Sequence, residues 1–246
     1  STATELADKG YEVTIVEKNE QAGGRARVFQ EKGFTFDMGP SWYWMPDIFD
    51  NYFARFGKKT ADYYTLKRLD PSYSVILSDK EVVDMPADYG ALRELFESIE
   101  PGAANALDRF LDQAAYKYKV GIQEFVWKPS VKITEFLSLR ILVDALRMDV
   151  FSSFYSHVRK FFKSETLLKL MEFPILFLGA ISQNTPAMYS LMNYAEIKLG
   201  TWYPMGGMHK IVQGMVDLAI SKGVNIQYNS EVTGFAIEAG QVKGVK

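Results

Sequence analysis

The sequence predicts an α/β protein in which a parallel-sheet domain, present in part, is interleaved with an α+β domain rich in helices. The first observation is a helical pattern at residues 2–9 that leads into Tyr11–Val16, a strand with apolar residues on both faces. Such strands are typical of parallel sheets that helices cover on each side. The second is the helical apolar spacing of residues 88–126 and 133–162. We therefore expect three segments: the first domain at 1–60, the second at 61–200, and a return to the first at 201–246.

Composition and charge exclude several functional classes. Of the 246 residues, 48% are hydrophobic and 24% are charged, which provides enough apolar material for a core. The formal net charge of −2 gives no general attraction to nucleic acid. The absence of cysteine excludes disulfides and thiolate metal sites, and two histidines are too few for a histidine-rich metal centre. We expect no metal site and no nucleic-acid partner. We also expect a cytoplasmic location, since the sequence shows neither a signal peptide nor ~18 unbroken apolar residues.

The first domain carries half of a dinucleotide site. Its strand ends at Glu17, and an acid at this place in a βαβ nucleotide-binding unit hydrogen-bonds a ribose hydroxyl about 20 residues after a glycine-rich phosphate loop. Counting back from Glu17 passes Ser1, so we expect the helix at 2–9 to be the tail of the phosphate-binding helix. The alternative is an ordinary solvated strand end at Glu17 and Lys18.

A glycine turn with an arginine follows this acid and favours a ligand site. Gly23 and Gly24 allow the backbone to pass close to a ligand, and Arg25 can hold a phosphate with two hydrogen bonds. A second tight turn is expected at Gly39 and Pro40. We expect the two turns to lie close together.

Four motifs carry a resemblance to one family. They are E-K-N-x-x-x-G-G-R-A at 17–26, G-F-x-F-D-x-G-P-S at 33–41, F-L-G-A-x-x-x-N-T-P-A-x-Y-S at 177–190 and W-Y-P-x-G-G-M at 202–208. In this order they resemble the flavin-dependent phytoene desaturases, and more broadly the FAD oxidoreductases that include amine oxidases. The resemblance, a partial Rossmann-like FAD/NAD(P)-binding domain included, implies FAD bound by Glu17, Lys18, Gly23, Gly24, Arg25, Gly39, Pro40, Ser41, Gly206, Gly207 and Val232. Val232 is implied to contact the adenine end through its backbone.

The same resemblance implies a reaction and a setting. The expected reaction is FAD-dependent desaturation of a long apolar carotenoid precursor such as phytoene, with quinone or oxygen as electron acceptor and peripheral contact with the inner face of the membrane. Glu135 stands where the family has an acid proposed to act on the substrate, and Arg140 is its nearest partner; Glu172 and Glu196 are alternatives on apolar helices. A related isomerase, ketolase or amine oxidase-like flavoprotein stays open. So does a non-catalytic fragment, inactive alone, that binds flavin weakly or not at all, because the family continues on both sides of this sequence.

Local patterns predict the remaining elements. Helices are expected at 48–57, 91–99, 103–120, 133–162 and 207–222, strands at 64–77, 82–85 and 224–227, and a hairpin around 238–240. A further helix is expected with Thr185 as its N-cap and Pro186 at its first position. The segment 133–162 mixes apolar, aromatic and basic residues. It either docks on a membrane surface or packs on the core with its basic side chains reaching solvent.

Overall fold

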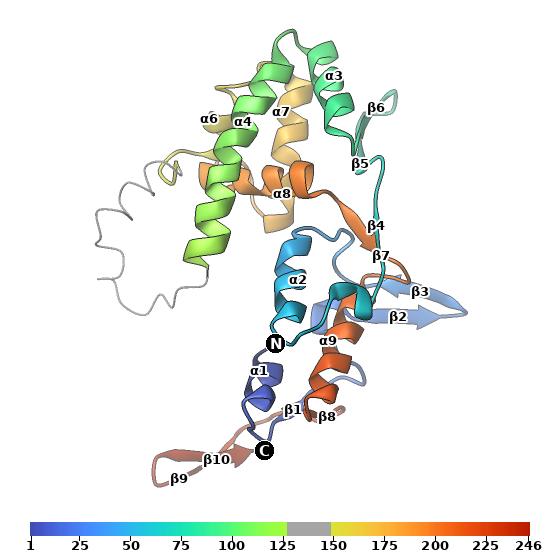
Figure 1. Ribbon diagram of the computed structural model, residues 1–246, viewed down its shortest axis with the longest axis vertical. Coiled ribbons are helices and arrows are strands. Elements are labelled where there is room, and N and C mark those ends of the chain that lie inside the picture. The colour runs from blue at the N-terminus through green and yellow to red at the C-terminus, as the bar shows by residue number, and fades with distance from the viewer. Residues whose placement is uncertain (127–148) are drawn as a thin grey trace. The chain divides into compact units, whose positions relative to one another are not determined.

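The computed structural model describes residues 1–126 and 149–246 (Figure 1). The chain divides into two compact units, Ser1–Lys67 with Trp202–Lys246 and Arg68–Thr201. It leaves the first unit in β4 (Leu66–Arg68) and returns in β7 (Trp202–Pro204), and these strands are hydrogen-bonded neighbours. The fold is therefore mixed α/β, and the first unit is assembled from two stretches that are far apart in the sequence.

The first unit contains a parallel strand pair. Its elements are α1 (Thr2–Asp8), β1 (Thr14–Val16), β2 (Val28–Glu31), β3 (Phe34–Asp37), α2 (Pro46–Ala54), α9 (His209–Ser221), β8 (Asn225–Gln227), β9 (Phe235–Glu238) and β10 (Gln241–Val245). Gly10 ends α1 with φ +88°, and its N–H donates to the Ala7 carbonyl at 2.9 Å, as predicted. β1 runs parallel to β8 with Ile15 opposite Ile226, which confirms the parallel pairing. The described sheet has only these two strands, so Ile15 is half-buried rather than enclosed by helices on both faces.

Two antiparallel hairpins complete this unit. β2 pairs with β3, and β9 pairs with β10. The turn of the second hairpin has positive φ at both Ala239 (+50°) and Gly240 (+76°), as tight two-residue hairpin turns require. This confirms the predicted hairpin, although its first strand begins only at Phe235.

Aromatic residues dominate the core of the first unit. Tyr43, Phe53, Phe56, Tyr64, Met208 and Leu218 form one buried cluster. Phe53 comes from α2 and Leu218 from α9, while the hydroxyls of Tyr43 and Tyr64 are hydrogen-bonded at 3.1 Å. α2 begins two residues earlier than predicted because Pro46 stands at its first turn, where a missing N–H costs nothing. Figure 1 shows α1 alongside α9, and an ion pair between Asp8 and Lys222 (2.6 Å) joins them.

The second unit is mainly helical. Its elements are β5 (Tyr73–Ser78), β6 (Glu81–Met85), α3 (Tyr89–Ile99), α4 (Ala103–Tyr118), α6 (Phe154–Val158), α7 (Glu165–Glu172) and α8 (Leu191–Leu199). The predicted strand pair is confirmed as an antiparallel β5–β6 hairpin. The Asp88 carboxylate caps α3 by accepting from Ala91 N–H at 2.9 Å, and α4 packs against α3 and against the sequence-distant α8 (Figure 1). Among the described residues, no helix combines the length and apolar character needed to cross a membrane.

Over its described part, the predicted helix at 133–162 is correct only at α6 (Phe154–Val158) and is not continuous. Residues 127–148 lie outside the described residues, and α6 begins only at Phe154. Asp149 adopts a left-handed conformation (φ +54°), and the Ser153 hydroxyl caps α6 by accepting from Ser156 N–H at 3.2 Å. These two local features start a new short helix where apolar spacing alone suggested a continuous one.

The predicted cap at Thr185 is also wrong. Its hydroxyl donates to the Ile181 carbonyl at 2.9 Å, and its own carbonyl accepts from Phe154 N–H at 2.7 Å. Pro186 is extended and precedes a 3-10 turn over Ala187–Ser190, after which α8 begins. The Thr-Pro pair therefore joins α6 to this turn rather than starting an α-helix.

Candidate cofactor site at the glycine-arginine turn

Glu17 is held in a defined position at the end of β1. Its N–H donates to the Gln227 carbonyl at 2.8 Å. Its Oε1 accepts from the backbone N–H (2.9 Å) and the side-chain amide (2.6 Å) of Asn19. The guanidinium of Arg27 donates to Asn19 Oδ1 at 2.9 Å. This chain of contacts ties the strand end to the segment that follows the glycine turn.

The glycine turn has the backbone geometry that requires glycine. Gly23 has φ +113° and Gly24 has φ +54°, and a 3-10 turn over Gly24–Ala26 is closed by a 2.8 Å bond from Ala26 N–H to the Gly23 carbonyl. Arg25 is exposed, and within residues 1–126 and 149–246 its guanidinium makes no hydrogen bond or ion pair. The turn therefore presents a cation whose hydrogen-bonding capacity is not used by the described residues.

The second turn packs directly on the first, as the sequence predicted. A Cβ at Gly39 would lie 2.1 Å from the carbonyl oxygen of Arg25, a distance that no side chain tolerates. Met38 N–H donates to the Arg27 carbonyl at 3.0 Å. Pro40 and Ser41 follow and are exposed. Glycine at position 39 is thus required by close backbone approach rather than by a positive φ.

The side chains of Asp37 and His209 join the return segment at 202–208 to the two turns. Gly206 and Gly207 have φ +96° and +108°. The Asp37 carboxylate accepts from Met208 N–H (2.8 Å) and from His209 N–H (3.1 Å) at the start of α9. The His209 ring Nδ1 in turn lies 3.1 Å from the Ala26 carbonyl. Three motifs that are separate in the sequence therefore meet in one structure.

The remaining two predicted cofactor residues lie at the edge of this arrangement. Lys18 is exposed. The segment after β8 runs beside the Glu17 turn, because Ser230 N–H donates to the Glu17 carbonyl at 2.9 Å and Asn229 N–H to the Asn19 carbonyl at 3.0 Å. Val232 lies two residues beyond Ser230 and is 41% exposed.

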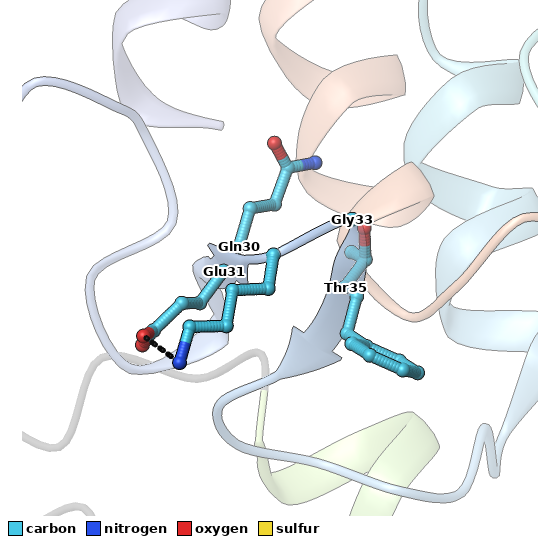
Figure 2. Close-up of a pocket in the computed structure, with 6 residues that line it drawn as sticks. Gln30, Glu31, Gly33 and Thr35 are labelled. Atoms are coloured by element: carbon cyan, nitrogen blue, oxygen red, sulfur yellow. Dashed lines mark ion pairs between the residues drawn. The ribbon is translucent and has the colours of Figure 1, made fainter.

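A surface hollow of about 360 Å³ lies elsewhere on this unit (Figure 2). Six consecutive residues of the β2–β3 hairpin line it, from Gln30 to Thr35. Its one ion pair, between Lys32 and Glu31 at 3.8 Å, is exposed on both sides. The hollow contains no residue of the glycine turns, so we do not assign it a function.

Comparison with known proteins places this geometry in a family. The family profile of flavin-containing amine oxidoreductases matches residues 1–245. The chain belongs to this family. The relatives it resembles include the carotenoid 3,4-desaturase of Haloarcula japonica, 38% identical over 233 residues that cover 94% of this chain and 47% of the relative. The zeta-carotene-forming phytoene desaturase of Myxococcus xanthus is 32% identical over 246 residues, or 100% of this chain and 48% of the relative.

The family resemblance found in the sequence is thereby confirmed. An oxidoreductase from Methanosarcina mazei shares the fold, with a TM-score of 0.56 and 15% identity over 99% of this chain and 52% of that protein. The chain spans about half the length of the curated relatives it matches.

The residues of the first unit fit the dinucleotide that a flavin-containing family uses. A carboxylate has about four acceptor sites, so the two bonds from Asn19 leave Glu17 with capacity for a ribose hydroxyl. The free guanidinium of Arg25 suits a phosphate. No group of three or more metal-binding side chains occurs in the described parts of the chain.

Sequence reasoning missed the two residues that connect the motifs. Asp37 lies inside the motif at 33–41 and His209 directly follows the motif at 202–208, but neither was singled out as a site residue. A usable signal was present: α9 follows two glycines with no Ser, Thr, Asp or Asn at its start, so its first N–H groups need an acceptor from elsewhere.

The catalytic candidates fall in the second unit. Glu135 and Arg140 lie outside the described residues. Glu172 is salt-bridged to Arg159 at 2.5 Å and accepts from the Ser182 hydroxyl at 3.0 Å. Glu196, the other alternative, is buried and accepts a hydrogen bond from the Tyr73 hydroxyl. Burial raises the pKa of Glu196 to about 8.

Proposed function

We propose that the first unit holds part of an FAD site and that the protein is a carotenoid desaturase. The observation that carries this proposal is the convergence of the Gly23–Arg25 turn, the Gly39 turn and the Gly206–Gly207 turn through Asp37 and His209. The names of the relatives, which are desaturases of carotenoids, supply the substrate class.

Each predicted residue receives a role in this proposal. Glu17 accepts a hydrogen bond from a ribose hydroxyl, and Lys18 belongs to the same end of the site. Arg25 pairs with phosphate. Gly39, Pro40 and Ser41 close the turn beside Arg25, Gly206 and Gly207 allow approach to the flavin ring, and the Val232 backbone meets the adenine end. When bound, FAD supplies the acceptor for the hydride removed from the substrate.

The second unit is the proposed place of the substrate, a long apolar polyene. Desaturation removes two hydrogens, one as hydride and one as a proton, and we assign proton transfer to Glu135 with Arg140 as its partner. The electrons pass on to a quinone or to oxygen. Leu176, Phe177, Leu178 and Ile181 are between 41% and 63% exposed, which supports peripheral contact with a membrane. We assign this contact to the inner, cytoplasmic face.

The test is a product spectrum. The gene that encodes this chain is expressed in cells that accumulate phytoene, and the extracted pigments are compared with those of cells that carry an empty vector. A product with a longer conjugated system, absorbing at longer wavelength, supports the proposal. An isomer with unchanged conjugation length, an oxygenated product or unchanged phytoene contradicts it.

A further inference from the structure

The start of α9 depends on a side chain from another element. The carboxylate of Asp37, the last residue of β3, takes the N–H groups of both Met208 and His209. A carboxylate at this place also complements the positive end of the helix dipole. The N-terminus of α9 is therefore complemented by a carboxylate of the protein itself.

A second contact joins α9 to the turn that contains Arg25. His209 reaches back with its ring Nδ1 to the carbonyl of Ala26 at 3.1 Å, and Ala26 closes the 3-10 turn that contains Arg25. Gly39, two residues after Asp37, lies against the carbonyl of Arg25. The backbone on both sides of Arg25 is thus held from β3 and from α9.

These contacts fix the backbone from which the Arg25 side chain projects. Its side chain is exposed and has no hydrogen-bond partner among the described residues, so only the backbone of its turn fixes the origin of the guanidinium. A bidentate phosphate contact depends on that origin, because the guanidinium donors are rigid and planar.

We infer that Asp37 and His209 are positioning residues that fix the Gly23–Arg25 turn and so aim Arg25 at the phosphate of a bound dinucleotide. The identity of the ligand rests on the proposed function, whereas the fixing of the turn does not. The test therefore has one arm without ligand and one arm with FAD.

The first arm measures amide hydrogen exchange in the purified chain. Asp37→Asn and His209→Ala are compared with Asp8→Asn, a control that breaks the ion pair with Lys222 at the other end of α9. We expect the Ala26 amide to exchange about ten-fold faster in the first two variants and unchanged in the control. Unchanged exchange at Ala26 overturns the inference, and so does equal acceleration throughout the first unit, which reports general destabilisation.

The second arm is a double-mutant cycle on FAD affinity. Asp37→Asn is expected to weaken FAD binding about ten-fold in the original chain and not at all in an Arg25→Ala background, because it acts through Arg25. Equal losses in both backgrounds overturn the inference while leaving the FAD site in place. If the original chain binds no FAD, the proposed function is contradicted, and the exchange arm alone decides whether Asp37 and His209 fix the turn.

Discussion

At the scale of single residues, two buried ionisable groups in the second unit are expected to make the free energy of unfolding depend on pH. Glu196 on α8 has the Tyr73 hydroxyl as its partner. His157 on α6 lies with Nε2 3.4 Å from Lys117 Nζ and Nδ1 3.6 Å from an Asp149 carboxylate oxygen. Burial favours the neutral form of both groups. Glu196 therefore lowers the free energy of unfolding at high pH, and His157 lowers it at low pH.

Glu196 is predicted to destabilise the fold in alkaline solution. Because burial raises its folded pKa to about 8, from an ordinary value of 4.5, its contribution to the free energy of unfolding is complete below about pH 4.5 and is lost as pH rises toward 8. Urea unfolding from pH 5 to 9 should show a flatter profile for Glu196→Gln, whereas the exposed control Glu81→Gln should follow the original chain. Parallel profiles for all three proteins would contradict this role.

His157 is predicted to destabilise the fold in acidic solution. Burial, with Lys117 adding to it, lowers the pKa of His157 to about 4, from an ordinary value of 6.5. The unfolded chain therefore takes up the proton first, and stability is lost as pH falls from about 6.5 toward 4. Asp149 opposes this effect, and Lys160 adds to it. His157→Gln should remove this part of the acid transition in unfolding measurements. A transition of the same midpoint and steepness in the variant would show that other groups cause it.

At the scale of elements, local patterns predicted those elements whose boundaries are set by neighbours in the sequence. Gly10 ends α1, Asp88 and Gly102 begin α3 and α4, and Ala239 and Gly240 turn the last hairpin, all through backbone or capping chemistry that sequence displays. These elements were predicted correctly in kind.

The errors arose where contacts outside the helical pattern decide the local structure. Thr185 has the sequence of a helix cap, but its carbonyl accepts from Phe154 N–H and its hydroxyl donates to the Ile181 carbonyl. Asp37 caps α9 from 171 residues away, a pairing that no local pattern displays. The site was therefore predictable as a set of motifs, and its connecting side chains were not.

The close approach of the two turns gives a prediction for Gly39. Gly39→Ala would place its Cβ 2.1 Å from the Arg25 carbonyl, so one of the turns must move. We expect a loss of about 1–3 kcal/mol in the free energy of unfolding of the first unit, as for other overpacked sites. Gly234→Ala is the control, because its Cβ would meet nothing within 4 Å. Equal unfolding midpoints in chemical denaturation for both variants would refute the close contact.

At the scale of the whole molecule, the family and the fold are shown, and the activity is proposed. The family profile covers residues 1–245, yet the chain spans about half of each desaturase it matches. The described chain forms two units, and the predicted cofactor residues all lie in the first, in both of its sequence stretches. The proposed desaturation and the proposed role of Arg25 both depend on FAD binding by this chain.

A titration of the purified chain with FAD tests that claim most directly, with flavin absorbance at roughly 450 nm as the signal. We predict saturable binding of one FAD per chain. Glu17→Ala and Arg25→Ala should each weaken the binding free energy by about 1–3 kcal/mol, because each loses one charged hydrogen bond. Lys32→Ala, an exposed change at the tip of the β2–β3 hairpin, should bind as the original chain does. Absence of saturable binding, or equal affinity in all four proteins, would contradict an FAD site formed by Glu17 and Arg25.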